Sequence, residues 1–368
     1  MDNIFDVTHF GAIGDDKTDC TKAFQNAINA ATKVKGVVIV PPGIYLCGEL
    51  KMREGVSIIG FSGWGYRETG GSVIKLNDVN AKCLFDLKEA YGARIKSLQL
   101  LGNNCLGNNI HCIDIEWDNY DSRMNDSLYR EDNSLPEETQ IGFREDSVII
   151  EDCQIKNFSG DAIHLENIWA FTVRKCLIIA NKGNGIWIKG WDGWITDNIF
   201  HTNHGAAVFS DTVCASITMT SNRIEWNRNG GLNLKNCNTI NVTGNYFDRS
   251  YGPAIRLIEG DEECNNIAIT GNVLNRSGKY HPSYDENEYE NSHIYIDGAS
   301  NIAITGNTFR IGKDDRNSGK LSPDYGIVYK HLNSCVITAN VFNNGALKSS
   351  FVDLGEHRGT NIIKDNAE

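Results

Sequence analysis

The chain has 368 residues, of which 40% are hydrophobic and 22% are charged, and its formal net charge is −12. No polar low-complexity tract interrupts it, so we expect a folded protein. Acidic and basic residues are interspersed without a basic stripe, which excludes a nucleic-acid partner. No stretch approaches the ~18 apolar residues of a membrane span.

The N-terminus and the cysteines together predict a cytoplasmic protein. Residues Met1 to Val7 include two aspartates and no apolar run of the kind that starts a secretory signal. The eleven cysteines form no C-x-x-C pair, so we interpret them as reduced, mostly buried thiols rather than a disulfide framework.

The first 50 residues differ from the rest of the chain. Residues 21–31 carry apolar side chains at helical spacing, and Asp19 stands where it could cap such a helix. A buried strand and a Pro-Gly turn follow in the segment Val37 to Tyr45. We expect residues 1–50 to form a short capping α-helix and the first coil of a larger repeat.

One short phrase recurs through the second half of the chain. It reads Ile-Ala-Ile-Thr-Gly-Asn at Ile267 and again at Ile302, and its asparagines are 24, 23, 27, 35 and 33 residues apart. Such an asparagine tolerates left-handed backbone, and its amide can bond the equivalent amide one coil away. We predict a structural row comprising Asn198, Asn222, Asn245, Asn272, Asn307 and Asn340.

Between these phrases lies a second recurring strand with strict alternation, as in Gly185-Ile-Trp-Ile-Lys189 and Ala254-Ile-Arg-Leu-Ile258. A unit of short strands without a helix cannot bury its own apolar face, so it must stack on copies of itself. We predict an all-β fold, a right-handed parallel β-helix in a single domain over residues 1–368. Inserted loops are expected at 117–145, 275–291 and 313–324, because long loops are exceptional in a tight solenoid.

The same residues carry a family resemblance. The order Phe10-Gly-Ala-x-Gly-Asp, a short helix, and Val38-Ile-Val-Pro-Pro-Gly-x-Tyr45 resembles the pectate-lyase-like superfamily of β-helices. That superfamily includes polygalacturonases, fructan-cleaving enzymes and phage tailspikes, so the resemblance implies the fold more strongly than a reaction. The chain lacks the outward Asp pairs and the Gly-His-Gly turn of polygalacturonases.

A narrower resemblance concerns three segments. Tyr251–Gly260, Thr220–Ile224 and Ile58–Gly65 are similar to parts of inulin fructotransferases, trimeric β-helices that release a cyclic difructose. The resemblance implies kinship and a homotrimer. In the register set by Arg256, however, Trp187 stands at the family's acidic strand position, so the catalytic acids of that family do not carry over.

Strand alternation predicts two columns of outward side chains, and a third ahead of them that begins with Asp161 and Asn184. The first column contains His164, Trp187, Phe209, Asn233, Arg256 and Tyr295, and the second contains Glu166, Lys189, Asp211 and Lys235. Exposed aromatic rings stack on the apolar faces of sugars, while carboxylates and amides bind their hydroxyls. The expected partner is therefore an oligo- or polysaccharide. Its predicted binding residues are Trp187, Lys189, His164, His204, Lys235, Arg256, Tyr295 and Glu225.

Cleavage or transfer of a glycosidic bond needs two carboxyl groups, ~5–5.5 Å apart for retention or ~6.5–9.5 Å apart for inversion. Asp211 and Glu166 are the preferred pair, with Asp161 third; Asp211 with Glu225 is another combination. We expect a glycoside hydrolase or fructotransferase-like enzyme that needs no cofactor and no metal.

Two other functions stay open. In the first, Lys189, Lys235 or Arg256 would abstract the proton next to a uronate carboxylate, as in polysaccharide lyases. In the second, the chain would be a non-catalytic glycan binder or a phage-tail-like β-helix. A charge ladder without any ligand also fits the second column, because neighbouring coils of a solenoid place opposite charges ~4.8 Å apart.

Overall fold

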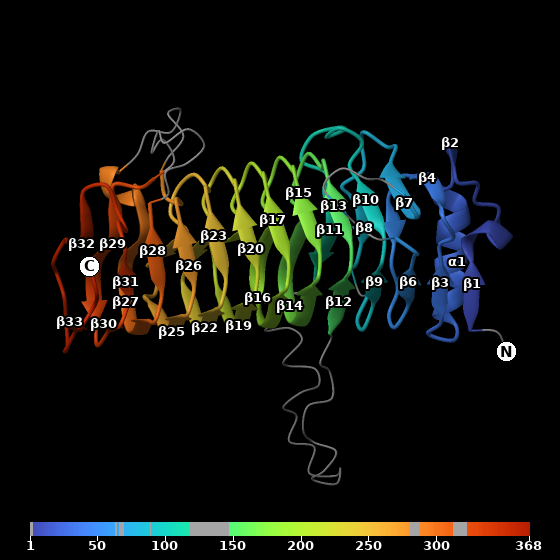
Figure 1. Cartoon of the computed structure of the whole chain (residues 1–368). Coiled ribbons are helices and arrows are strands. Elements are labelled where there is room, and N and C mark those ends of the chain that lie inside the picture. Colours follow the sequence, from blue (N-terminus) through green and yellow to red (C-terminus); the bar gives the residue numbers. More distant parts are fainter. Residues whose placement is uncertain are drawn as a thin grey trace, which may run out of the picture.

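The computed structural model describes residues 3–62, 65, 70–88, 90–117, 147–279, 287–311 and 322–368. The insertions predicted at 117–145 and 313–324 lie largely outside these residues, and the one predicted at 275–291 lies outside them only at 280–286. Within the described part of the chain, no helix is long and apolar enough to cross a membrane. Figure 1 shows that the strands stack as successive coils from the N-terminal to the C-terminal end.

Each full coil contributes one strand to each of three faces, and all the strand pairings are parallel. The predicted all-β solenoid is therefore confirmed. The first face is formed by β5 (Leu50–Lys51), β8 (Cys83–Asp86), β11 (His111–Glu116), β18 (Val208–Ser210), β21 (Leu232–Lys235), β24 (Ile255–Ile258) and β32 (Ser349–Asp353).

The second face follows the first along the chain. It is formed by β1 (Ile4–Asp6), β3 (Val37–Ile39), β6 (Ser57–Ile59), β9 (Arg94–Lys96), β12 (Val148–Glu151), β19 (Cys214–Thr220), β22 (Cys237–Thr243), β25 (Cys264–Thr270), β30 (Val336–Thr338) and β33 (Ile362–Lys364). Four long strands bend around the corner and belong to both faces: β14 (Ile163–Arg174), β16 (Ile186–Thr196), β27 (Ser292–Thr305) and β29 (Tyr325–Asn333).

The third face is a separate sheet of twelve strands. It comprises β2 (Asp15–Asp19), β4 (Gly43–Cys47), β7 (Ser72–Leu76), β10 (Gln99–Leu101), β13 (Gln154–Lys156), β15 (Leu177–Ile179), β17 (Ile199–His201), β20 (Arg223–Glu225), β23 (Tyr246–Asp248), β26 (Val273–Asn275), β28 (Thr308–Arg310) and β31 (Val341–Phe342). The inward residues of the three faces form one apolar core along the solenoid. Ten of the eleven cysteines are buried, consistent with their behaviour as small apolar side chains.

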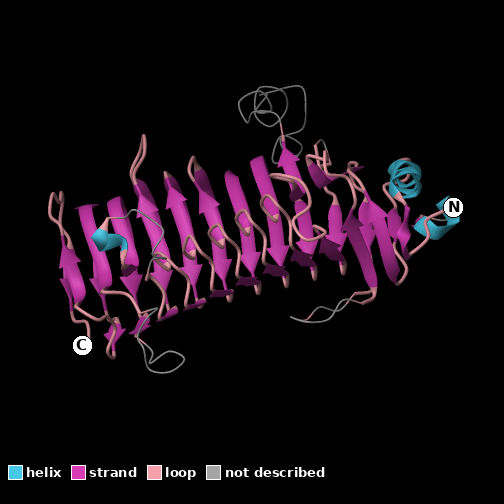
Figure 2. Cartoon of the chain, turned by 90° about the horizontal axis from the view of Figure 1, so that it is seen from above, coloured by secondary structure: helices cyan, strands magenta, loops and turns pink. Residues whose placement is uncertain are grey.

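Two short 3-10 helices and one α-helix complete the described elements: η1 (Val7–Phe10), η3 (Glu288–Glu290) and α1 (Thr21–Thr32). The buried face of α1 includes Phe24 and Ile28, and the helix contacts η1, β1, β3 and β5 near the N-terminal end (Figure 2). Asp19 accepts a hydrogen bond from the amide of Thr21, the first helical residue, at 2.9 Å. That α1 shields the end of the solenoid stays a prediction.

The predicted asparagine row is a continuous hydrogen-bonded ladder between the second and third faces. The backbone N–H and the amide Nδ2 of Asn222 both donate to Oδ1 of Asn245, at 3.0 Å each, and Asn245 repeats this pattern toward Asn272. The left-handed conformation, however, belongs to the residue before each asparagine, such as Asp197 or Ser221. The asparagines are therefore selected by their amides, and the expectation about their backbone was wrong.

Candidate active site

The first column predicted on the first face exists in the structure. His164 is the register partner of Trp187, Trp187 of Phe209, Phe209 of Asn233, and Asn233 of Arg256. These side chains are half-buried, as expected for residues that line the floor of an outer surface. The aliphatic residues between them, such as Ile186 and Ile188, are fully buried in the core.

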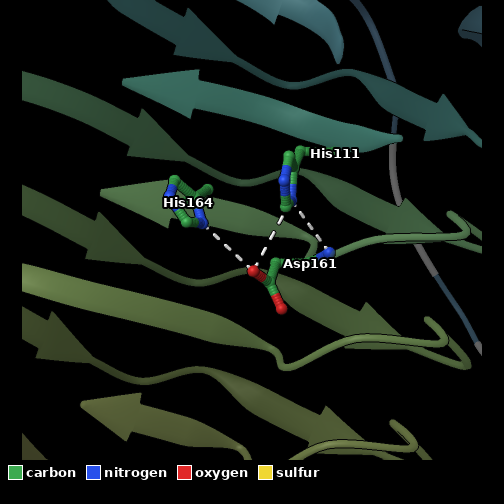
Figure 3. Close-up of side chains that lie close together, drawn as sticks. All are labelled: His111, Asp161 and His164. Carbon is green, nitrogen blue, oxygen red and sulfur yellow. Dashed lines mark hydrogen bonds and ion pairs between the residues drawn. The ribbon is translucent and has the colours of Figure 1, made fainter. Parts of the chain in front are cut away.

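A histidine–aspartate cluster lies at the N-terminal end of this column (Figure 3). Asp161, in the turn before β14, accepts a hydrogen bond from Nδ1 of His164 at 3.1 Å through Oδ2. Its other oxygen, Oδ1, accepts from the backbone N–H and the side-chain amide of Asn184 at 2.7 and 3.0 Å. Since Nδ1 of His164 donates to a carboxylate, Nε2 is the acceptor nitrogen of the neutral ring.

His111 supports the cluster from the preceding coil. Its Nδ1 accepts the backbone N–H of Asp161 at 3.0 Å, so this ring carries its proton on Nε2 when neutral. Burial lowers the pKa of His111, which favours that neutral form. The His111 and His164 rings lie 4.6 Å apart. Asp161 is thus a buried residue that orients His164, although its column position predicts a more exposed carboxylate.

Gly183 is needed for this arrangement. A Cβ atom added there would lie 2.5 Å from both the amide nitrogen and Oδ1 of Asp161, closer than any real side chain permits. The turn Gly183-Asn-Gly185 therefore brings the amide of Asn184 against the carboxylate of Asp161, because its first residue has no side chain.

The described residues contain two groups whose ligand atoms lie close enough to hold a metal ion: His111, Asp161 and His164, and Glu259, Asp297 and His331. In the first group the Nδ1 lone pair of His111 is used by a backbone N–H, and Oδ1 of Asp161 is used by Asn184. The ligand atoms left in this group, on Asp161 and His164, are fewer than the three protein ligands of a catalytic zinc site. We interpret the first group as a hydrogen-bonded His–Asp pair.

In the second group both ring nitrogens of His331 form hydrogen bonds with carboxylates. Nδ1 lies 2.8 Å from Oδ1 of Asp297, and Nε2 lies 2.5 Å from Oε2 of Glu356. The hydrogen bond to Glu356, followed by that to Asp297, raises the pKa of His331. A cationic imidazole held between carboxylates explains this group as an ion-pair network without a metal.

Trp187 lies next to His164 with its ring parallel to the imidazole, at a centroid distance of 4.3 Å and an interplanar angle of 5°. Its indole N–H donates to Oδ1 of Asp211 at 3.2 Å. This stack and this hydrogen bond hold the indole in one orientation on the outer surface. Trp187 is therefore an oriented aromatic side chain with one ring face against His164 and a carboxylate at its edge.

The predicted charge ladder is present in part. Nζ of Lys189 lies 3.2 Å from Oε1 of Glu166 on the preceding coil, and both side chains are 31% exposed. Asp211 follows on the next coil, but its carboxylate bonds the indole of Trp187. Lys189 is the register partner of Glu166, and Asp211 directly follows β18 on the coil after that of Lys189. The backbones of Glu166 and Asp211 are therefore two coils apart, which corresponds to ~9.6 Å at ~4.8 Å per coil.

Three other predicted site residues lie on another face, are buried, or already bond a side chain of the protein. Glu225 belongs to β20 on the third face and is buried there. Its Oε1 lies 2.6 Å from Nη2 of Arg223. The pairing of Asp211, on the first face, with Glu225 was therefore wrong. Tyr295 is only 3% exposed, although its column position predicts an outward ring. Arg256 forms a two-bond contact with Glu290, an acid near the end of the insertion predicted at 275–291.

The two remaining predicted binding residues flank the column. His204 is exposed in the turn between β17 and β18, next to Gly205, whose added Cβ would meet Oδ1 of Asn184. Burial lowers the pKa of His204, and the cations Arg228 and Lys182 act in the same direction. Lys235 ends β21, half-buried, in the column of Glu166 and Lys189.

His111 was missed as a contributor to the site, and Asn184 was expected only as an outward side chain in the column of Asp161. The segment His111-Cys-Ile-Asp-Ile-Glu116 alternates as the later strands do, and it pairs in register with Ile163–Glu166. That alternation could have identified it as an earlier copy of the first-face strand. The hydrogen bonds of Asn184 depend on the turn geometry, for which the sequence carries no comparable signal.

The chain is similar over residues 139–289 to the family model described as "Right handed beta helix region". It aligns with a polygalacturonase of Cryptomeria japonica at 49% identity over 41 residues, 11% of this chain and 8% of that protein, so the match spans a small part of the relative's length.

Two solved structures match almost end to end. One is DFA-IIIase from Arthrobacter chlorophenolicus A6 in complex with GF2, with a TM-score of 0.61 and 15% identity over 100% of this chain and 98% of that chain. The other is the A-module of the Azotobacter vinelandii mannuronan C-5 epimerase AlgE4, with a TM-score of 0.59 and 16% identity over 98% of both chains. The right-handed parallel β-helix fold is thereby confirmed.

Proposed function

We propose that the chain is a carbohydrate-active enzyme that cleaves or transfers a glycosidic bond on the first face, over β14, β16 and β18. The similar structures support a role on carbohydrate in general, since their names are those of carbohydrate-acting enzymes. At this level of sequence identity they support the fold more than the reaction.

One observation carries the proposal: Trp187 is held beside two carboxylates that face the same surface. Its ring stacks on His164 and its N–H bonds Asp211, while Glu166 and Lys189 form the adjacent ion pair. A sugar ring lying over the column would meet the aromatic residues below it and the carboxylates at its edge.

Glu166 and Asp211 are the proposed catalytic pair. Their backbone spacing of ~9.6 Å lies just beyond the upper end of the ~6.5–9.5 Å range between the carboxyl groups of inverting enzymes, and well beyond the ~5–5.5 Å of retaining ones. One carboxyl group would protonate the leaving oxygen and the other would activate water or a sugar hydroxyl. Lys189, between them, would bind a substrate oxygen.

A second candidate reaction is favoured by the His164–Asp161 pair. A histidine whose Nδ1 donates to a carboxylate presents Nε2 as a base, as in other His–Asp pairs. Beside Lys189, this base could abstract the proton next to a uronate carboxylate, leading to elimination or epimerisation. The reaction differs from the predicted lyase in using a histidine instead of a lysine or arginine as the base.

A panel of fructans, uronans and neutral α- and β-glycans distinguishes these reactions. New reducing ends, or a product lighter than its hydrolytic counterpart by one water without ultraviolet absorbance, would support cleavage or transfer by the carboxylate pair. Absorbance from a new double bond, or a changed uronate configuration without cleavage, would support the histidine base. Binding without any turnover on the panel would favour a glycan-binding protein and count against both reactions.

A further inference from the structure

The outward column of the first face changes in exposure along the solenoid. Trp187, Phe209 and Asn233 are half-buried, whereas Tyr295 is 3% exposed and Val328 fully buried, although all five occupy equivalent positions. Exposure therefore falls sharply just after Arg256. Something beyond the strands themselves must cover the later part of the column.

The cover is the segment 287–291, which contains η3 and contacts β27 and β29. Nε and Nη2 of Arg256 donate to the two carboxylate oxygens of Glu290, at 3.0 Å each, and Nη1 donates to Oδ1 of Asn233 at 3.2 Å. Nδ2 of Asn287 donates to the hydroxyl of Tyr295 at 3.2 Å. Two-bond arginine–carboxylate contacts are strong and geometrically specific, so they fix the segment in place.

The same segment is also tied to the next coil. The side chain of Asn291 exchanges hydrogen bonds with Asp324, donating to its carboxylate at 3.0 Å and accepting from its backbone N–H at 3.2 Å. Lys348, one coil further on, lies 3.1 Å from the carboxylate of Asp324. The ring of Tyr289 lies 5.8 Å from that of Tyr325. These contacts make the segment a wall attached at both sides.

At the other end of the column Asp114, the register partner of His164, is 3% exposed. Its carboxylate lies 2.9 Å from Nζ of Lys82, whose side chain is 57% exposed, so among the described residues this end is bordered by an ion pair and not by a covering segment. The open floor runs from His164 to Asn233, four coils whose first and last members are ~14 Å apart. This length accommodates only a few sugar units.

We propose that the Arg256–Glu290 contact forms the closed end of the substrate groove, so that the enzyme acts on short oligosaccharides or on chain ends and not inside long polymers. This inference rests on the proposed function. Arg256, expected from the sequence to bind substrate, acts here through Glu290 as a positioning residue for the wall. Specificity for length then follows from steric exclusion, since a continuing chain would collide with residues 287–291.

The test compares wild-type protein with Glu290→Ala, which frees the guanidinium of Arg256 and loosens the wall. Glu288→Ala, an exposed acid on the same 3-10 helix, is the matched control. Each protein is incubated with end-labelled oligosaccharides of increasing length and with the parent polymer, and the position of each cut is determined from the labelled products. Arg256→Lys, which keeps the charge but loses the two-bond contact, replaces Glu290→Ala if that variant does not fold.

We expect wild-type protein and Glu288→Ala to release products from one chain end only, and Glu290→Ala to raise the share of internal cuts several-fold. Internal cutting of the polymer by wild-type protein would overturn the inference with no need of any variant. An unchanged cutting pattern in a folded Glu290→Ala protein would also overturn it. Absence of turnover at every length would instead defeat the proposed function and this inference with it.

Discussion

At the scale of single residues, side-chain direction was predictable and hydrogen-bond partners were not. Alternation placed Trp187, Glu166 and Lys189 on the outer surface, as the structure has them. It also placed Asp161 outward, but this carboxylate is buried between Asn184 and His164. Asp161 precedes the strand, where the backbone follows a turn, so the two-residue period no longer decides which way a side chain points.

Tyr295 illustrates a second limit at this scale. Its alternation is that of an outward residue, and the strand does direct it outward, but η3 covers it. Burial raises the pKa of Tyr295 to about 12. A segment that covers a strand is placed there by tertiary contacts, and the two-residue alternation of the strand carries no information about them.

We predict that the buried side chain of His293 makes the stability of the protein depend on pH. It is fully buried, with its ring 5.6 Å from that of Phe309, and burial lowers its pKa from 6.5 to about 3. Below pH 6.5 the unfolded chain binds a proton that the folded chain does not, so this residue destabilises the fold as the pH falls toward 3. The effect approaches ~1.4 kcal/mol per pH unit.

Chemical denaturation of wild-type protein and His293→Leu at several pH values measures this effect. The free energy of unfolding of wild-type protein should fall relative to that of the variant as the pH decreases below 6.5. Phe309→Leu, which perturbs the same packing without a titrating group, should differ from wild type by a constant amount. A constant difference for His293→Leu as well would show that His293 does not carry the effect.

At the scale of elements, the repeat made the strands and the asparagine ladder predictable. Each amide of the ladder needs its counterpart one coil away, so the asparagines recur once per coil in the sequence. A second ladder, Asn181, Asn203 and Asn227, between the third face and the first, was missed. It extends over only three coils and is continued by Ser250, so its period is much harder to detect.

The ladder predicts a large loss of stability on substitution of Asn245. Replacing it with alanine removes the acceptor of Asn222 and the donor to Asn272. Each buried amide group left unsatisfied costs ~1–3 kcal/mol. We expect Asn245→Ala to lower the free energy of unfolding by ~2–4 kcal/mol, measured by chemical denaturation.

Asn238→Ala is the control for this change, because Asn238 is exposed on the same coil. It should alter the free energy of unfolding by no more than ~0.5 kcal/mol. Equal effects of the two substitutions would argue against the ladder as a source of stability.

At the scale of the whole molecule, stacking of coils brings together residues that are far apart in the sequence. His111 and Asp161 are fifty positions apart and form one hydrogen bond. The fold was predictable because every coil obeys the same pattern. The site was predictable only in part, because it is built from turns and from the covering segment 287–291, where coils depart from the pattern. A homotrimer and a cytoplasmic location stay predictions.

The central claim is that Glu166 and Asp211 act as a pair on a glycosidic bond. The most direct test is the turnover of the glycan cleaved by wild-type protein, measured for Glu166→Gln and Asp211→Asn. Asp197→Asn is the control, because Asp197 is exposed at another corner of the solenoid. We predict that each of the two variants folds normally and loses at least ~100-fold in kcat, because each lacks one of two groups needed for proton transfer. Near wild-type turnover in either folded variant would contradict the account.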